Sequence, residues 1–328
     1  MTALLTVSGL RKEFAIADAG PFGESVRFAA VDNVSFTVNH GEVVGLVGES
    51  GSGKTTVGRC VVRLAQPTAG QMIFDGEELT TLSGNALRVA RRRIQIVFQD
   101  PFASLNPRLT VGRTVAEPIV IHGLAVSRAE RRTKVRSLLE EVGLPADTEQ
   151  RYPHEFSGGQ RQRIGIARAL AADPDLIIAD EPVSALDVSV QAQVHNLLVQ
   201  LQQRRALAIL FISHDLDLVR HFCDRVLVMY AGRLVEVGPS VELARHPAHP
   251  YTRALMSAIP RRGGATRSGR VILKGEIPSP LAPPSGCIFR TRCPQAISSC
   301  ADAVPQLAEV APGRFVACSN PAAVNIGL

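Results

Sequence analysis

The residues from Gly48 to Thr56 match the pattern G-x4-G-K-T, in which a lysine and a threonine follow closely spaced glycines. Such glycines let successive backbone N–H groups point into one concavity, where they bind phosphate oxygens. In this pattern Lys54 reaches the β- and γ-phosphates of a nucleotide, and the Thr55 hydroxyl binds Mg²⁺. A chance glycine-rich turn is the alternative interpretation. The predicted nucleotide-binding residues are Gly48, Ser50, Gly51, Ser52, Gly53, Lys54, Thr55 and Thr56.

Two carboxylates, Asp180 and Glu181, directly follow the apolar run Leu176–Ala179. Such a run is typical of a buried strand, and α/β sheets carry their ligand crevice at the carboxyl ends of the strands. We expect Asp180 to hold Mg²⁺, directly or through water, and Glu181 to polarise an attacking water. Taken alone, the same residues also fit a buried strand followed by an ordinary polar turn.

A third candidate site is the run Ser157, Gly158, Gly159 and Gln160, which precedes an arginine-bearing helical segment. A serine and two glycines at a helix N-terminus make an anion site. This site is useful only if a second phosphate-bearing surface meets it, and as an isolated four-residue match it is weak.

The elements that position these residues follow from the hydrophobic pattern. Apolar runs alternate with helical patterns, which predicts an α/β domain with a largely parallel sheet. We expect short outer strands at Leu4–Lys12 and Val31–Val38, with a loop over 15–24 between them. After about Gly238 the composition shifts toward proline, glycine and arginine, which indicates a separate extension. Buried strands are expected at Val43–Val47, Ile94–Phe98, Leu176–Ala179 and Ala208–Ile212, and helices at Lys54–Leu64, Ser127–Val142, Ile164–Ala172 and Val190–Arg204.

The composition is that of a folded protein of about two domains, with 328 residues of which 45% are hydrophobic. The formal net charge of +6 suits a polyanionic partner without choosing among nucleotide, nucleic acid and acidic lipid. No stretch reaches the roughly 20 mostly apolar residues of a membrane span, and residues 1–11 lack a secretory signal pattern. We therefore expect a cytosolic protein whose six cysteines do not form structural disulfides.

Taken together, the motifs stand in the order and spacing of the ATP-binding subunits of ABC transporters, which the chain resembles over about residues 4–238. The resemblance implies a P-loop NTPase fold with a RecA-like core, a β-subdomain and a helical subdomain at about residues 100–170. It also implies ATP hydrolysis, with 1–238 as the ATP-binding domain. The catalytic residues that it implies are Lys54, Gln99, Glu181 and His214.

The resemblance assigns roles to residues outside the phosphate loop. Gln99 resembles the Q-loop residue that contacts Mg²⁺ and the lytic water, and His214 resembles the switch histidine at the γ-phosphate. The Mg²⁺ ligands are then Thr55, Gln99 and Asp180. Phe14 stands where the family places an aromatic ring that stacks on adenine, although a core phenylalanine is a competing interpretation.

The resemblance also implies a head-to-tail dimer. In the family, the segment corresponding to Ser157–Gln160 of one subunit closes over the ATP held by the other, and Asp187 resembles the residue that communicates across this dimer. ATP binding closes the dimer and hydrolysis reopens it. Phe156 replaces the usual leucine at the start of this motif and should pack similarly.

The C-terminal part narrows the resemblance to the dipeptide/oligopeptide (and nickel) importer ATPases. The supporting segments are Gln99–Pro107, Tyr152–Phe156, His249–Leu255 and the late cysteines. This resemblance implies an extension over 239–328 and a peripheral location on the cytoplasmic face of the membrane. It implies as partners a second, different ATPase subunit, two transmembrane permeases and, through them, an extracytoplasmic peptide-binding protein.

The late cysteines Cys287, Cys293, Cys300 and Cys318 are spaced C-x5-C-x6-C-x17-C. Four thiolates that converge can hold a [4Fe–4S] cluster or a zinc ion, and the absence of a C-x2-C pair argues against a zinc ribbon. Resemblance to subfamily members with four such cysteines favours the [4Fe–4S] cluster, with zinc as the second choice and unliganded thiols as the third. Cys60 and Cys223 lie in apolar stretches and are expected to be buried structural thiols.

Two other functions remain open at this point. The chain could energise import of nickel or another small solute, since the ATPase does not touch the cargo. It could instead be an ABC ATPase that acts on nucleic acid, but it has one phosphate-binding loop and its basic residues do not gather with aromatic residues into a stacking platform. We therefore expect no nucleic-acid partner.

Overall fold

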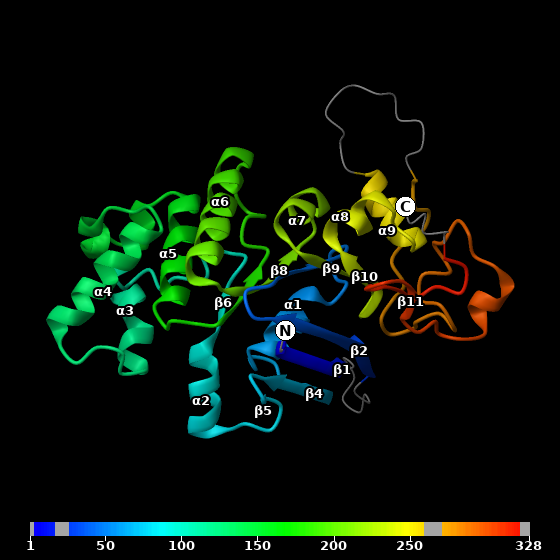
Figure 1. Cartoon of the computed structure of the whole chain (residues 1–328), viewed down its shortest axis with the longest axis horizontal. Helices are drawn as coiled ribbons and strands as arrows, with labels where there is room; N and C mark the ends of the chain where they lie inside the picture. The colour runs from blue at the N-terminus through cyan, green and yellow to red at the C-terminus, as the bar shows by residue number, and fades with distance from the viewer. Residues whose placement is uncertain (1–2, 17–25, 259–270, 322–328) are drawn as a thin grey trace, which may run out of the picture.

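The computed structural model describes residues 3–16, 26–258 and 271–321. A helical region lies at one end of the long axis, the C-terminal segments lie at the other end, and two sheets lie between them (Figure 1).

The larger sheet has eight strands in the order β11-β12-β10-β9-β3-β8-β7-β6. Strands β6, β7, β8, β3 and β9 pair in parallel, whereas β10, β11 and β12 pair antiparallel at the other edge. The expected α/β fold with a largely parallel sheet is therefore confirmed. The strands are β3 (Val43–Val47), β6 (Ile94–Val97), β7 (Leu176–Asp180), β8 (Ala208–Ser213), β9 (Arg225–Tyr230), β10 (Arg233–Pro239), β11 (Ala308–Ala311) and β12 (Arg314–Val316).

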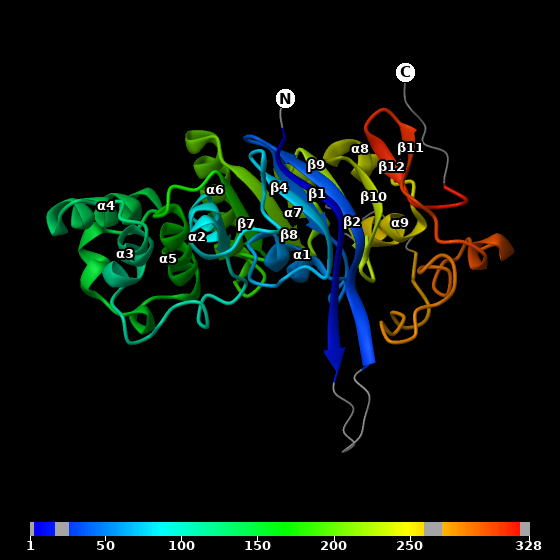
Figure 2. The same cartoon turned by 90° about the horizontal axis from the view of Figure 1, so that it is seen from below.

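The smaller sheet is antiparallel, with four strands in the order β2-β1-β4-β5. In Figure 2, β1 and β2 run side by side as a long pair. Both strands are longer than the sequence predicted. Strand β1 continues through Ala15 and Ile16, the first two residues of the expected loop over 15–24. The rest of that loop lies outside the described residues. The strands are β1 (Ala3–Ile16), β2 (Val26–Asn39), β4 (Ala69–Phe74) and β5 (Glu77–Glu78).

The helices include several that the sequence pattern did not indicate, among them α3, which continues through Pro118. Helices α3, α4 and α5 pack together in the region at one end of the molecule. Among the helices of the described ranges, none combines the length and the apolar character needed to cross a membrane. The helices are α1 (Lys54–Val61), α2 (Gly84–Arg93), α3 (Val111–Ile121), α4 (Arg128–Glu141), α5 (Gly158–Leu170), α6 (Val188–Arg205), α7 (Leu216–Phe222), α8 (Ser240–Arg245) and α9 (Pro250–Ser257), with short 3₁₀ turns at Ala146–Gln150, Pro153–Glu155 and Ser298–Ala301.

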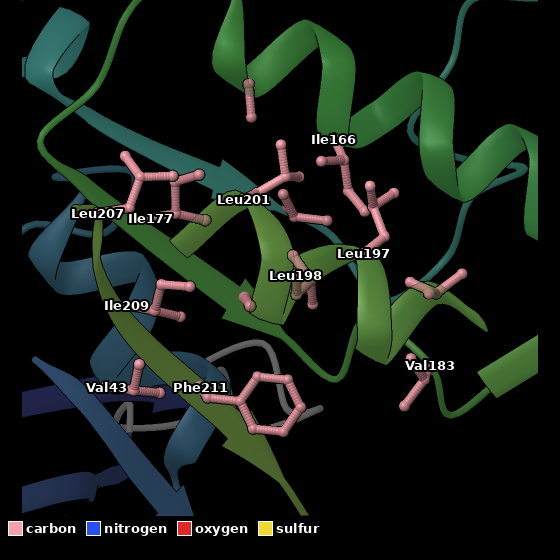
Figure 3. Close-up of a cluster of buried hydrophobic side chains, with 14 of the residues drawn as sticks. Val43, Ile166, Ile177, Val183, Leu197, Leu198, Leu201, Leu207, Ile209 and Phe211 are labelled. Carbon is pink, nitrogen blue, oxygen red and sulfur yellow. The ribbon is translucent and has the colours of Figure 1, made fainter. Parts of the chain in front are cut away.

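The core beneath the parallel strands explains why these strands stay in register. Helix α6 places buried side chains at i, i+3, i+4 and i+7, which is one face of a helix. Figure 3 shows this face packing toward β7, β8 and α5, where strand residues such as Ile177 and Phe211 meet it. A strand with every residue buried cannot slip by one position without losing this packing. The buried α6 residues are Val194, Leu197, Leu198 and Leu201.

A buried ion pair ties the C-terminal extension to the larger sheet. Glu236 on β10 has no exposed surface, and its carboxylate accepts the backbone N–H groups of Ala248 and His249, each at 2.9 Å. Arg314 on β12 donates to the same carboxylate at 3.2 Å. Burial lowers the pKa of His249 to about 3, so this ring is neutral beside the pair. One carboxylate therefore joins the neighbouring strand and the start of α9.

An aromatic cluster provides the apolar part of this junction. Tyr230 on β9, Tyr251 on α9 and Phe289 are fully buried, and their ring centroids lie 4.7 to 5.5 Å apart. Such tilted and edge-to-face contacts add to the free energy gained from burying large rings. The extension is therefore packed against the end of the parallel sheet.

Replacing Arg314 by alanine should lower the free energy of unfolding by about 3 kcal/mol, because Glu236 would remain buried without its cation. Urea denaturation followed by circular dichroism measures this loss. Arg245→Ala, at an exposed position of α8, is the matched control and should change stability by less than about 0.5 kcal/mol. Equal effects of the two substitutions would contradict a stabilising role for the buried pair.

Candidate functional site

The phosphate-loop motif lies between β3 and α1, the context that the pattern requires. Lys54 begins α1, is 5% exposed, and its Nζ donates to the carbonyl oxygens of Gly48 (2.8 Å) and Glu49 (2.9 Å). Burial lowers the pKa of the Lys54 amine, and the nearby Glu181 and Asp180 carboxylates oppose this shift. A Cβ on Gly48 would lie 2.1 Å from the carbonyl oxygen of Met229, so only glycine allows the loop this close to β9.

Asp180 ends strand β7 and lies directly beside the start of α1. The Thr55 hydroxyl donates to Asp180 Oδ1 at 2.9 Å. Burial raises the pKa of Asp180, while the Thr55 hydrogen bond lowers it. The structure thus brings together the side-chain oxygens of two predicted Mg²⁺ ligands that are 125 positions apart in the sequence.

Glu181, Gln99 and His214 converge on one another. Glu181 Oε2 accepts from Gln99 Nε2 at 3.0 Å and lies 3.2 Å from His214 Nδ1. Glu181 has a positive φ of 44°, and its N–H donates to the carbonyl oxygen of Ile212 on β8. This backbone conformation is uncommon outside glycine and turns the carboxylate out of the strand direction. Three strand ends therefore supply one polar cluster.

Phe14 lies on β1 opposite Phe28 of β2, with ring centroids 6.0 Å apart, and is 40% exposed. It is therefore not a core residue. A cavity of about 800 Å³ lies nearby, lined by Phe28, by Ser50 and Gly51 of the phosphate loop, and by residues of the proline-rich segment 277–286.

Ser157 caps α5, where its Oγ accepts the Gln160 N–H (3.3 Å) and Gln160 Oε1 accepts the Ser157 N–H (3.0 Å). Phe156 is buried in the core, as expected for a substitute of leucine. Within the described ranges, no hydrogen bond or ion pair joins Ser157–Gln160 to the phosphate loop. Asp187, at the N-terminus of α6, is exposed. The structure thus separates these predicted residues from the others.

Three residues at the phosphate loop were missed by sequence reasoning. The carboxylate of Glu49, which occupies one of the four positions that the motif leaves open to any residue, forms an ion pair with Arg292. The Glu49 N–H donates to Tyr251 Oη. The partners are 243 and 202 positions away in the sequence, and no motif connects them. Of the two partners, only Tyr251 lies in a segment that the sequence analysis had noted, His249–Leu255, which resembles the importer ATPases.

The expected [4Fe–4S] cluster is wrong, and the zinc alternative falls with it. Among the described residues, which include Cys287, Cys293, Cys300 and Cys318, no group of three or more His, Cys, Asp or Glu side chains could hold a metal ion. All four are free cysteines.

These cysteines are packed as free thiols of the folded chain. Burial raises the pKa of Cys287, Cys293 and Cys318. Cys287 and Cys293 pack against the large hydrophobic core instead. Cys60 and Cys223 are buried, as expected for structural thiols, and burial raises the pKa of Cys60 to about 11.

Two family models match the chain. Residues 31–184 match the model described as "ABC transporter", and residues 235–300 match the model described as "Oligopeptide/dipeptide transporter, C-terminal region". A Brucella ovis protein, provisionally named a peptide import ATP-binding protein, is 59% identical over 317 residues, which cover 97% of this chain and 98% of the relative. The oligopeptide transport ATP-binding protein AppF of Bacillus subtilis is 53% identical over 319 residues, covering 96% of each chain.

Solved structures resemble the larger part of the chain. The ATP-binding cassette MJ0796, solved as a dimer in a post-hydrolysis state with ADP and Pi, has a TM-score of 0.64 and 30% identity, covering 72% of this chain and 98% of its own. The protein cbiO1 of Clostridium perfringens, part of the ABC transporter complex cbiONQ, has a TM-score of 0.63 and 28% identity, covering 74% and 90%. These structures confirm the P-loop NTPase fold.

Two glycines of the loop should differ in what they tolerate. Gly53 has φ 101° and a Cβ there would lie 2.3 Å from the Ala30 carbonyl oxygen, whereas Gly51 has φ 78° and no atom within 4 Å of a Cβ. Gly53→Ala should lower the free energy of unfolding by about 3 kcal/mol, and the control Gly51→Ala by about 1 kcal/mol, the cost of a left-handed alanine. Urea denaturation of both variants tests this, and equal losses would show that the close approach carries no cost.

Proposed function

Because the chain belongs to the family of ABC transporter ATP-binding subunits with an oligopeptide/dipeptide-type C-terminal region, we propose that it is the ATP-hydrolysing subunit of a di- or oligopeptide importer. The observation that carries this proposal is that near full-length relatives named for peptide import share both parts of the chain. The chain is an ABC ATPase; its residue roles and its solute are the proposed part.

The phosphates of ATP are proposed to bind in the loop of Gly48, Ser50, Gly51, Ser52, Gly53, Lys54, Thr55 and Thr56. Support comes from the buried Lys54 amine, which is bound to two loop carbonyl oxygens and can exchange them for phosphate oxygens. Phe14, an exposed ring at the nearby strand pair, is proposed to stack on adenine.

The proposed Mg²⁺ ligands are Thr55, Asp180 and Gln99. Their chemistry fits the ion, because Mg²⁺ prefers oxygen donors and takes one or two carboxylates together with phosphate and water. When bound, Mg²⁺ neutralises charge on the phosphates. The hydrogen bond between Thr55 and Asp180 holds the first two donors together in advance.

Glu181 is proposed to be the general base. Its carboxylate accepts the proton of the attacking water, which a base within hydrogen-bond reach does most effectively. Gln99 donates to Oε2 of this carboxylate, and His214 Nδ1 lies 3.2 Å from the same oxygen, so both can orient the water and the γ-phosphate.

The second half of the ATP site is proposed to come from a partner subunit. Ser157, Gly158, Gly159 and Gln160 form a capped helix N-terminus that makes no bond to the phosphate loop of its own chain in the described ranges. A second subunit placed head to tail brings this helix to the other ATP. Asp187, exposed at the start of α6, is proposed to contact the partner. We expect that partner to be a different ATPase chain.

The remaining partners are proposed to be two transmembrane permeases and, through them, an extracytoplasmic peptide-binding protein. This arrangement places the chain on the cytoplasmic face of the membrane. We propose that the chain divides into an ATP-binding domain over 1–238 and an extension over 239–328.

Glu181→Gln should reduce ATP turnover by about 100-fold or more, because the amide cannot accept the proton. ATP should stay bound, in a closed dimer. Phosphate release and gel filtration with ATP measure the two effects in the full-length chain purified together with its partner ATPase subunit. The matched control Glu140→Gln, on the exposed side of α4, should hydrolyse ATP normally. Turnover by Glu181→Gln within a few fold of wild type would disprove the assignment.

Deleting the gene in its source organism should abolish uptake of labelled di- or oligopeptides. A plasmid that carries the wild-type gene or Glu140→Gln should restore uptake, and Glu181→Gln should not. Permeases should co-purify with the tagged chain. Intact peptide uptake together with lost nickel uptake would assign the importer to nickel, and co-purifying nucleic acid without permeases would favour the other class of ABC ATPase.

A further inference from the structure

Two side chains of the C-terminal extension bind Glu49, the second residue of the phosphate-loop motif. Arg292 Nη1 donates to Glu49 Oε2 at 2.8 Å and Nη2 donates to Oε1 at 3.3 Å, so the pair is bidentate. Tyr251 Oη accepts the Glu49 N–H at 2.8 Å. The extension therefore holds both the side chain and the backbone of this residue.

The Arg292 guanidinium is held firmly on its own side. Its side chain is only 9% exposed, it faces the Tyr230 ring at 5.8 Å, and Nη1 lies 3.4 Å from Tyr230 Oη. A planar guanidinium fixed by an aromatic neighbour loses little side-chain entropy when it binds a carboxylate in two places. The pair is therefore a defined contact and differs in kind from an exposed surface ion pair.

Glu49 in turn organises the loop. Its carbonyl oxygen accepts from Lys54 Nζ at 2.9 Å and from the Ser52 N–H at 3.2 Å. A shift of Glu49 therefore moves the acceptor that positions Lys54. Its carboxylate also lies in a loop that is proposed to bind phosphates, where an unpaired negative charge would repel the ligand.

We propose that Arg292 is a positioning residue for nucleotide binding, which holds the phosphate loop in its binding shape and neutralises Glu49. The inference rests on the proposed nucleotide site and extends it, because it gives the C-terminal extension a part in binding ATP within its own subunit. The effect passes through Glu49, and this distinguishes it from a general contribution of Arg292 to folding.

The test is a double-mutant comparison with magnesium ADP, which is not hydrolysed and carries the β-phosphate that Lys54 contacts. Calorimetry on the full-length chain gives its dissociation constant. Arg292→Ala should weaken binding about tenfold, the loss expected for a charged hydrogen-bonded pair. Glu49→Gln should weaken it by less than about threefold, because it removes the repelling charge as well as the ion pair. In the Glu49→Gln background, Arg292→Ala should add less than about threefold.

Arg290→Ala is the matched control. Arg290 belongs to the same segment and donates to Ser285, and no hydrogen bond or ion pair in the described ranges joins it to Glu49 or Lys54, so its loss should leave ADP affinity unchanged. Arg292→Lys, which keeps the charge but not the two-point contact, provides a milder variant that retains the fold. It should weaken binding about threefold in the wild-type background and not measurably in the Glu49→Gln background.

The outcomes separate the two proposals. Equal weakening by Arg292→Ala and Arg292→Lys in both backgrounds, or no weakening in the wild-type background, would overturn the positioning role while the nucleotide site stands. Failure of the wild-type chain to bind magnesium ADP would overturn the nucleotide site and this inference together.

Discussion

The parallel register of β3, β8 and β7 is the constraint on which the candidate site depends. Val47 pairs with Ser213, and Ile212 pairs with Asp180, so three strands end at the same edge of the sheet. The residues after these ends are the phosphate loop, His214 and Glu181. The core that fixes the register of these strands also fixes the distances between the residues at their ends. The phosphate loop and His214 therefore lie at the same edge although they are far apart in the sequence.

The sequence was a good guide where one local pattern specifies one local structure. The apolar run before Asp180 predicted a buried strand, and the glycines before Lys54 predicted a loop between strand and helix; both are observed. It was a poor guide where structure depends on distant partners. Strands β11 and β12 are short and partly exposed, and they form because β10 offers an unpaired edge. The contacts of Glu49 with Arg292 and Tyr251 were invisible for the same reason.

The error at the cysteines has a physical lesson. Spacing along the chain counts thiols, but it does not show how the fold arranges them. In the fold, Cys287 and Cys293 lie against apolar side chains of the large core, and no group of three or more His, Cys, Asp or Glu side chains in the described ranges could hold a metal ion. The buried Glu236–Arg314 pair and the rings around Phe289 supply the polar and apolar contacts at the junction of the extension with the sheet.

The two hydrogen bonds that Lys54 donates to the Gly48 and Glu49 carbonyl oxygens have a consequence for the entropy of binding. They hold the loop in its curved shape with the chain's own groups, and the amine is already buried. A loop held in this way loses little conformational entropy when it binds a phosphate, and rigid sites bind their ligands more tightly for this reason.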